Sequence, residues 1–356
     1  MIDLNLVIEV LIIIFKVVFV TMVLFSLPMP LTWIERKVAG HMQARLGPWR
    51  VGPHGLLQPL ADTIKLLLKE DIVPENADKF LFKLAPIISM VPAFAVFVAI
   101  PVGDSFKIPF IEKTFTLYIS DMNVGILYVL AIGGLSIYGI ILGGWASNSK
   151  YSLLGGLRSA AQMISYEVAL SFAAIGVVMM TNSLSLVDMV RAQDGGFWHW
   201  NILYLPVGPV WFAVFFIAAL AEINRVPFDL PEDEGTLAAG YHTEYSGMRF
   251  SFFMLTEYVA MVTASALAVV MFFGGWNAPI DFRTIEILTP ITSVSWIYSC
   301  FGLFWFTVKV SFFIYLFMWI RFTLPRYRYD QLMTVGWKIL IPICLGAILV
   351  TGFMRI

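Results

Sequence analysis

AEINRVPFDLPEDEGTLAAGYHTEYSGMRFSFFMLTEY, residues Ala221–Tyr258, is an acidic stretch set between two long apolar segments. Six carboxylates and two arginines fall between Glu222 and Arg249, in a chain that is 59% hydrophobic and only 13% charged. A carboxylate at membrane depth is costly unless it pairs, hydrates or takes up a proton. The stretch therefore predicts a membrane protein in which a polar loop joins two spans and carries much of the function.

The composition is typical of a protein with several membrane spans. Mean hydropathy is +0.83, and 15% of the residues are aromatic. The net charge of -1 and the lack of a basic stripe predict no nucleic-acid partner. Cys300 and Cys344 are isolated, the histidines are dispersed, and no phosphate-binding glycine loop occurs. We therefore expect the chain to bind no Fe–S cluster, flavin, nucleotide or metal.

Eight apolar segments are long enough to cross about 30 Å of hydrocarbon. Each must be a helix, because lipid cannot satisfy the open edge of a strand. The predicted spans are Leu4–Leu27, Phe80–Ile100, Val124–Trp145, Ala160–Thr181, Pro206–Arg225, Met248–Phe273, Trp296–Arg321 and Gln331–Phe353. No repeat or linker divides the chain, so residues 1–356 are predicted to form one all-α membrane domain.

Basic residues are concentrated in alternate loops. The loops after the first, third, fifth and seventh spans hold about 15 of the 23 lysines and arginines. Positively charged loops remain in the cytoplasm. The cytoplasmic loops are therefore predicted at about residues 34–79, 146–159, 222–247 and 322–330. Both termini are then expected on the outer face of the bacterial cell membrane.

The first cytoplasmic loop contains an amphipathic segment after a stretch rich in turns. GPWRVGPHG at Gly47–Gly55 has two Gly-Pro steps that interrupt any helix. In the following Leu56–Glu70, leucines share one face while Asp62 and Lys65 lie on the other. The segment is too short and too charged to span, so it is predicted to lie along the membrane interface. The alternative is a surface helix that covers the bundle.

Ionisable side chains also occur inside the predicted spans. Glu167, Glu222 and Glu257 lie in the fourth, fifth and sixth spans. Arg225 is a candidate partner of Glu222, one turn further on. Three carboxylates on different spans, continued by an acidic loop, favour a hydrated proton relay. The alternative is that each carboxylate forms a salt bridge that fixes the register of its helix, or reaches an interface.

Four long strings are similar to those of one known family. They are ERKVAGHMQARLGPWRVGPHGLLQPLADTIKLLLKE (Glu35–Glu70), GWASNSKYSLLGGLRSAAQMISYEV (Gly144–Val168), the acidic stretch Ala221–Tyr258, and RYDQLMTVGWK (Arg328–Lys338). Through these strings, in order and nearly end to end, the chain resembles the quinone-site membrane subunit of respiratory complex I. In bacteria this family is the H subunit of NADH-quinone oxidoreductase.

The resemblance implies a component of an enzyme complex that is not catalytic on its own. In that family, electrons from NADH pass through flavin and Fe–S clusters of other subunits to ubiquinone or menaquinone. Quinone reduction then drives proton translocation. The implied substrate is quinone. The implied partners are hydrophilic Fe–S and quinone-site subunits, small and antiporter-like membrane subunits, and the lipid bilayer.

The resemblance also implies roles for individual residues. Positions that match the family's proton path are Glu35, Asp62, Glu167, Glu222, Glu232, Glu234 and Glu257. Positions that match the quinone chamber or its entrance are Arg36, Arg45, Lys65, Arg225, Phe228 and Asp229. A basic and aromatic lining suits a quinone, because its head passes through anionic reduced states while its ring and tail remain apolar.

Two positions depart from the family pattern. Trp49 stands where the family commonly has Asn, which affects the turn or the mouth of the chamber. Thr236 stands at the third acidic position of the loop, where the family commonly reads E-x-E-S-E-L. Either the chain has one proton-handling carboxylate fewer, or Asp233 compensates.

Three other functions remain open from the sequence. The chain could be the homologous membrane component of a related complex with another electron donor, such as a membrane-bound hydrogenase or photosynthetic complex I. It could be a stand-alone proton or cation transporter, although the large first loop is better suited to docking a partner. It could also be a passive anchor for subunits that carry all the quinone chemistry.

Overall fold

The computed structural model describes residues 4–108, 111–229, 239–280 and 295–355. The eight predicted spans are all helical, and the prediction of an all-α polytopic membrane protein is confirmed. The helices of the spans are α1 (Leu4–Ser26) with α2 (Pro28–Met42), α4 (Lys79–Ala95), α5 (Gly125–Gly134) with α6 (Ser136–Ala146), α7 (Lys150–Thr181), α9 (Val207–Glu222), α11 (Gly247–Phe272), α13 (Ser295–Thr323), and α14 (Tyr329–Thr334) with α15 (Ile341–Arg355). A π-helical segment, Val335–Leu340, joins the last two.

Seven helices within the described residues are long and apolar enough to cross a membrane, and α9 is a shorter apolar helix of 16 residues. Helix α9 begins after Pro206 and ends where Asn224 takes a left-handed φ of 56°. Its short length is compatible with its position, because it packs against α7 in the interior. At this contact a Cβ on Gly176 of α7 would lie 2.3 Å from the ring of Trp211 of α9, so a small residue lets the two helices approach closely.

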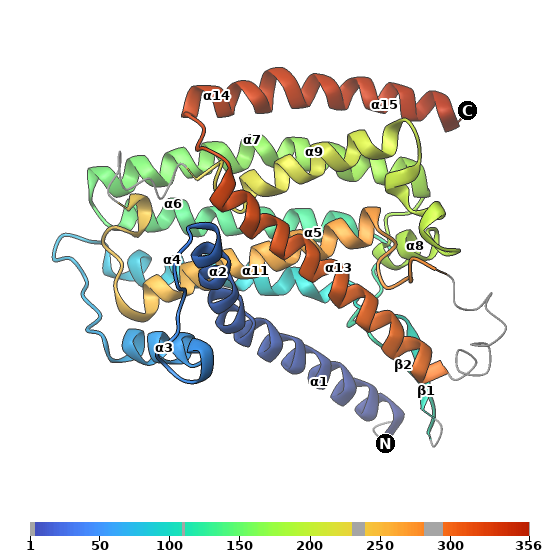
Figure 1. The fold of residues 1–356 in the computed structure, drawn as a ribbon, viewed down its shortest axis with the longest axis horizontal. Helices are drawn as coiled ribbons and strands as arrows, with labels where there is room; N and C mark the ends of the chain where they lie inside the picture. Colours follow the sequence, from blue (N-terminus) through green and yellow to red (C-terminus); the bar gives the residue numbers. More distant parts are fainter. Residues whose placement is uncertain (1–3, 109–110, 230–238, 281–294, 356) are drawn as a thin grey trace.

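Consecutive spans run in opposite directions, so both termini lie at the same end of the bundle (Figure 1). We call the end that carries residues 36–83, 146–150, 223–229, 239–249 and 321–328 the basic end, and the opposite end the far end. Helix boundaries at the basic end differ from the predicted spans. Helix α2 continues to Met42, and α7 begins at Lys150, so most of segment 146–159 is helical. Gly155 of this added length packs against the backbone of Gly240, which no larger residue would allow.

The far end contains two elements that the hydropathy pattern did not predict. An antiparallel hairpin pairs β1 (Ser105–Ile108) with β2 (Ile111–Thr116), and Ser105 lies opposite Thr116. The Nζ of Lys16 in α1 donates to Thr116 Oγ1 at 2.6 Å, which ties the first span to this hairpin. The second element is α8 (Leu186–Arg191), a short buried helix.

The predicted amphipathic helix is present at the basic end as α3 (Gln58–Leu68). Its leucine face is exposed rather than packed on the bundle, and Leu68 is 83% accessible. Only Pro59 of this helix is buried. An apolar face that the chain itself leaves uncovered favours the interfacial interpretation over a helix that covers the bundle.

Candidate functional site

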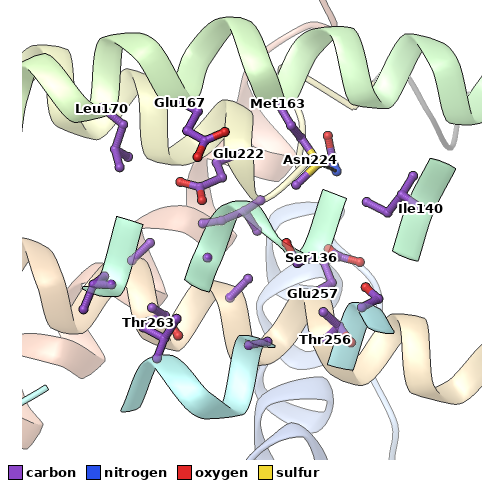
Figure 2. A pocket seen from close by; sticks show the side chains of 18 of the residues that line it. Ser136, Ile140, Met163, Glu167, Leu170, Glu222, Asn224, Thr256, Glu257 and Thr263 are labelled. Carbon is purple, nitrogen blue, oxygen red and sulfur yellow. Dashed lines mark hydrogen bonds between the residues drawn. The ribbon is translucent and has the colours of Figure 1, made fainter. Parts of the chain in front are cut away.

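A cavity of about 100 Å³ lies inside the bundle, between α5, α6, α7, α9 and α11 (Figure 2). It is large enough to hold several water molecules. Three carboxylates predicted from the sequence, Glu167, Glu222 and Glu257, are among its lining residues. The remaining lining is mostly apolar, with Ser136, Asn224 and Thr263 among its further polar groups. The structure therefore brings together acids from three different spans.

The carboxylates of Glu167 and Glu222 point toward one another across the cavity (Figure 2). Space for them comes from the interruption of the third span, where α5 ends at Gly134 and α6 begins at Ser136. A Cβ atom on Gly134 would overlap Oε1 of Glu167, and one on Gly133 would lie 3.9 Å from Oε1 of Glu222. The two adjacent glycines thus belong to the site, although the sequence reasoning did not select them. Their occurrence as a pair inside an apolar span was the available signal.

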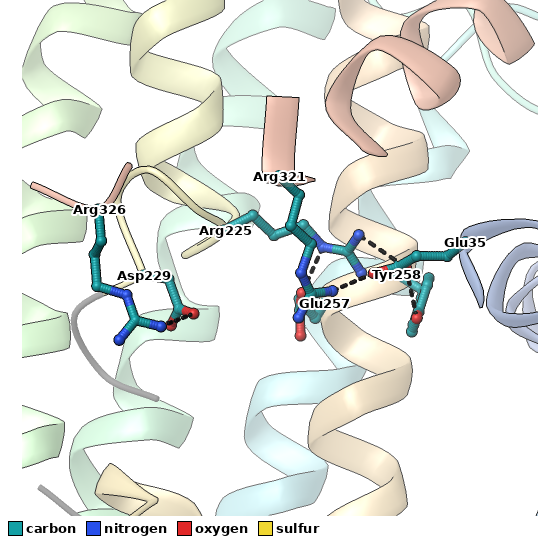
Figure 3. Close-up of polar contacts among 7 residues, drawn as sticks. All are labelled: Glu35, Arg225, Asp229, Glu257, Tyr258, Arg321 and Arg326. Atoms are coloured by element: carbon teal, nitrogen blue, oxygen red, sulfur yellow. Dashed lines mark hydrogen bonds and ion pairs between the residues drawn. The ribbon is translucent and has the colours of Figure 1, made fainter. Parts of the chain in front are cut away.

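A buried ion cluster lies beside the cavity, toward the basic end (Figure 3). Arg225 is 2% exposed and donates from Nε to Glu257 at 2.5 Å and from Nη1 to Glu35 at 3.1 Å. Arg321, at the end of α13, pairs with the other oxygen of Glu35. The hydroxyl of Tyr258 donates to Glu35 at 2.8 Å, and its ring lies 4.7 Å from the Arg225 guanidinium. Two cations balance two anions in an apolar interior.

Charge balance makes this burial tolerable. Removing an ion from water costs several kcal/mol of free energy, and only a close ion pair with additional hydrogen bonds offsets this cost. Arg225 lies in the loop that follows α9. An arginine side chain keeps its proton in proteins, and here Glu257 and Glu35 lie against the guanidinium. Arg225 is therefore always protonated, and any charge change in the cluster must occur elsewhere.

The predicted partnership of Glu222 with Arg225 is wrong. Arg225 pairs instead with Glu35 and Glu257, on α2 and α11. A partner one turn further on requires a continuous helix, but α9 ends at Glu222 and the chain turns at Asn224. Arg225 is therefore not one helical turn above Glu222.

Glu257 belongs both to the internal cavity and to the buried ion cluster. It lines the cavity and is the direct partner of Arg225. Glu35, by contrast, is a cluster residue held by two arginines and a tyrosine. Both glutamates and Arg225 were predicted as site residues, whereas Arg321 and Tyr258 were not. Neither Arg321 nor Tyr258 can be recognised from its neighbours in the sequence, because the contact of each, Glu35, is far away along the chain.

Phe228 and Asp229 lie close to the cluster but are held separately. The ring of Phe228 is buried between Tyr166 and Tyr327, with centroids 5.5 Å away in each case. Asp229 is buried and pairs with Arg326 at 3.1 Å (Figure 3). Both predicted quinone-site positions are therefore fixed by the segment that follows α13.

The other predicted positions lie on the surface of the basic end. Arg36 and Asp62 form a partly exposed ion pair at 2.5 Å, which joins α2 to α3. Arg45 and Lys65 are exposed. Glu232 and Glu234, with Asp233 and Thr236, lie outside the described residues.

Trp49, the first departure from the family pattern, has a defined environment. Its ring receives the Nζ of Lys37 at 5.1 Å and meets the ring of His54 edge to face at 4.7 Å. The indole of Trp33 donates to the backbone oxygen of His54 at 3.2 Å, so aromatic contacts order this turn.

In the described part of the chain, no group of three His, Cys, Asp or Glu side chains could hold a metal ion.

Fold and site define a multi-pass membrane protein in which an internal carboxylate cavity adjoins a buried ion cluster. Residues 14–352 match the NADH dehydrogenase family. The chain is 56% identical to the H subunit numbered 2 of NADH-quinone oxidoreductase from Rhizobium meliloti (strain 1021), over 96% of each chain. It is 50% identical to the H subunit numbered 1 of the same enzyme from Geobacter sulfurreducens, over 91% of this chain and 89% of that one. The chain therefore belongs to this family of membrane subunits, and the resemblance seen in the sequence is confirmed.

Proposed function

We propose that the chain is the membrane subunit of a proton-translocating NADH:quinone oxidoreductase, and that it forms part of both the quinone chamber and the proton path. The relatives' names state the enzyme complex and its two substrates. One observation supports the proposed proton path: Glu257 belongs both to the buried ion cluster and to the internal cavity. It is ion-paired in the buried cluster and also lines the cavity that holds Glu167 and Glu222.

The cluster can convert a change of charge into a proton movement. Arg225 and Arg321 hold Glu35 and Glu257 as anions. Negative charge that arrives on the reduced quinone nearby competes for these guanidiniums and weakens their hold on the carboxylates. A carboxylate that loses its counter-ion in an apolar site takes up a proton. Glu257 then passes its proton through water in the cavity to Glu222 and Glu167.

The quinone side of the proposal uses the basic end. Arg36, Arg45 and Lys65 line the chamber or its entrance, and Phe228 and Asp229 form its inner wall. Asp62, beside the chamber, belongs to the proton path. The exposed leucine face of α3 supports this, because an interfacial helix places the entrance at the level where a lipid-soluble quinone leaves the bilayer. Glu232 and Glu234 join the chamber to the proton path.

The basic end is the cytoplasmic side in this proposal, and both termini lie outside. Hydrophilic Fe–S and quinone-site subunits dock on the basic end, while small and antiporter-like membrane subunits contact the flanks of the bundle. Copurification with NADH-binding and Fe–S subunits would support NADH as the donor. A different set of hydrophilic partners would identify a related complex with another donor.

The proton path is tested with Glu222→Gln and Glu257→Gln, made separately. Quinone reduction and proton pumping are measured in membranes that contain the assembled complex. We expect both variants to lose pumping, since an amide cannot carry a proton between the two groups. Values near those of the wild type in both variants would exclude the relay. Proton transport by the purified single chain in liposomes would instead indicate a stand-alone transporter.

A further inference from the structure

The far end of α11 is buried, which is unusual for a spanning helix. Residues 269–272 are fully inaccessible. The last carbonyls of a helix have no partner within it, so a buried helix end needs donors from elsewhere. Here Gln193 Nε2 donates to Val270 O at 3.0 Å, and Asn201 Nδ2 donates to Met271 O at 2.7 Å. Side chains of the segment around α8 thus close the end of α11 and keep it from solvent.

The next carbonyls are bound by a cation. Lys309 of α13 is 9% exposed, and its Nζ donates to the backbone oxygens of Phe273, Gly275 and Asn277 at 2.7, 3.0 and 2.6 Å. Its three ammonium protons are therefore all used. The ring of Trp200 lies over the ammonium, 4.4 Å from centroid to Nζ. We call these three oxygens and the Trp200 ring the carbonyl cage.

The cage is built by a glycine turn. Gly274 and Gly275 have φ of 70° and 52°, a conformation that turns neighbouring carbonyls to one side of the chain. A Cβ on Gly274 would lie 2.6 Å from the Trp200 indole nitrogen, and one on Gly275 would lie 2.6 Å from a methyl of Val190. The backbone is thus shaped closely around the ammonium.

Three carbonyl acceptors around one Nζ can be satisfied together only by an ammonium, so the geometry of the cage requires a charged Lys309. Among the described residues, no acid forms an ion pair with it, whereas the buried Arg225 and the partly exposed Arg321 both have acidic partners. Carbonyl dipoles and the negative end of the α11 helix stabilise its charge. A buried cation of this kind is costly, and a neutral donor would bind the same carbonyls more cheaply. The charge itself therefore needs an explanation.

The position of the carbonyl cage along the bundle explains why a charge is present there. Helix α11 lines the cavity as far as Leu267, and the buried apolar residues 269–272 and then the cage follow along the same helix. A proton leaving the cavity along α11 toward the far end would cross apolar packing and then meet a fixed positive charge. Fixed cations exclude protons from membrane pores by this repulsion.

We infer that Lys309 and its carbonyl cage form an electrostatic seal, which prevents protons in the Glu167–Glu222 cavity from crossing to the far end through this chain. The inference rests on the proposed role of the cavity in proton transfer. Protons from the cavity must then leave sideways, toward neighbouring membrane subunits, and cannot exit directly.

The test separates charge from hydrogen bonding. Lys309→Gln keeps donors for the cage but removes the charge, and Lys309→Arg keeps the charge. The whole complex is reconstituted into liposomes with potassium and valinomycin, and passive proton influx after an acid jump is measured without substrate. We expect Lys309→Gln to raise influx roughly tenfold, as the loss of one unit charge near the path predicts. Lys309→Arg should match the wild type.

Lys338→Gln is the matched control, because Lys338 is an exposed lysine in the last span. If Lys309→Gln assembles and its influx equals that of the wild type, the seal is refuted and Lys309 is only a helix cap. If it does not assemble, Trp200→Leu is used instead: it removes the ring over the ammonium, so that water enters the cage and screens the charge. Influx should then rise, and an unchanged value refutes the seal. Because no substrate is present, a failure of quinone-linked pumping in the wild type would refute the proposed function without affecting this result.

Discussion

Arg225 donates from Nε to Oε1 of Glu257 at 2.5 Å, and this bond joins the loop after α9 to the interior of α11 across 32 residues of sequence. It places a permanently charged guanidinium beside a carboxylate that also lines the internal cavity. In the proposed proton path, this pair is the point at which a charge change in the cluster would reach the cavity.

Arg225→Met should destabilise the protein by about 3–5 kcal/mol, because it leaves two buried carboxylates with half of their compensation. The measurement is the thermal midpoint of the purified complex, together with the amount assembled in membranes. The double variant Arg225→Met/Glu257→Gln removes one of the orphaned charges and should recover part of the loss. Equal destabilisation of the single and double variants would contradict this account.

Gly134→Ala should reduce proton pumping by roughly an order of magnitude, because its methyl group displaces the Glu167 carboxylate from its position opposite Glu222. Pumping is measured in inverted membrane vesicles. Gly346→Ala is the control, since a Cβ on Gly346 of α15 meets nothing within 4 Å. Adding Glu167→Asp to Gly134→Ala shortens the acid and should restore part of the rate. A Gly134→Ala variant that pumps like Gly346→Ala would show that the space is not needed.

Tyr258→Phe should lower stability by about 1 kcal/mol, the usual contribution of one hydrogen bond, because Glu35 keeps both arginines. The loss must be smaller than that of Arg225→Met, and both are read from the same thermal unfolding experiment. Tyr138→Phe, at an exposed ring, controls for loss of a hydroxyl. A loss as large as that of Arg225→Met would mean that the hydroxyl, and not the ion pairs, holds Glu35.

Arg36→Ala should raise the KM for quinone roughly tenfold through loss of one charged hydrogen bond, and change stability by less than about 1 kcal/mol. The small stability change follows from the exposure of the pair, with side chains 50% and 33% accessible. Arg328→Ala removes another exposed ion pair at the basic end and should leave KM unchanged. If Arg36→Ala also leaves KM unchanged, this surface is a passive anchor.

Periodicity and hydropathy were sufficient for the parts of the fold that lipid imposes. A run of about 20 apolar residues in a bilayer can only be a helix, and α11 accordingly occupies Gly247–Phe272 where the span Met248–Phe273 was predicted. The hairpin of β1 and β2 was not predictable in this way, because it lies outside the spans, where hydropathy no longer selects one structure.

The sequence by itself determined the membrane class, the order of the spans, the family and the acidic positions Glu35, Glu167, Glu222 and Glu257. These follow from local composition and from strings of residues, which do not depend on packing. Only the tertiary structure decided the partners: Arg225 with Glu35 and Glu257, Arg321 with Glu35, and Lys309 with the carbonyls after α11. A buried charge is stabilised by whichever groups surround it within a few ångströms, and in a bundle of helices those groups come from spans that are distant in sequence.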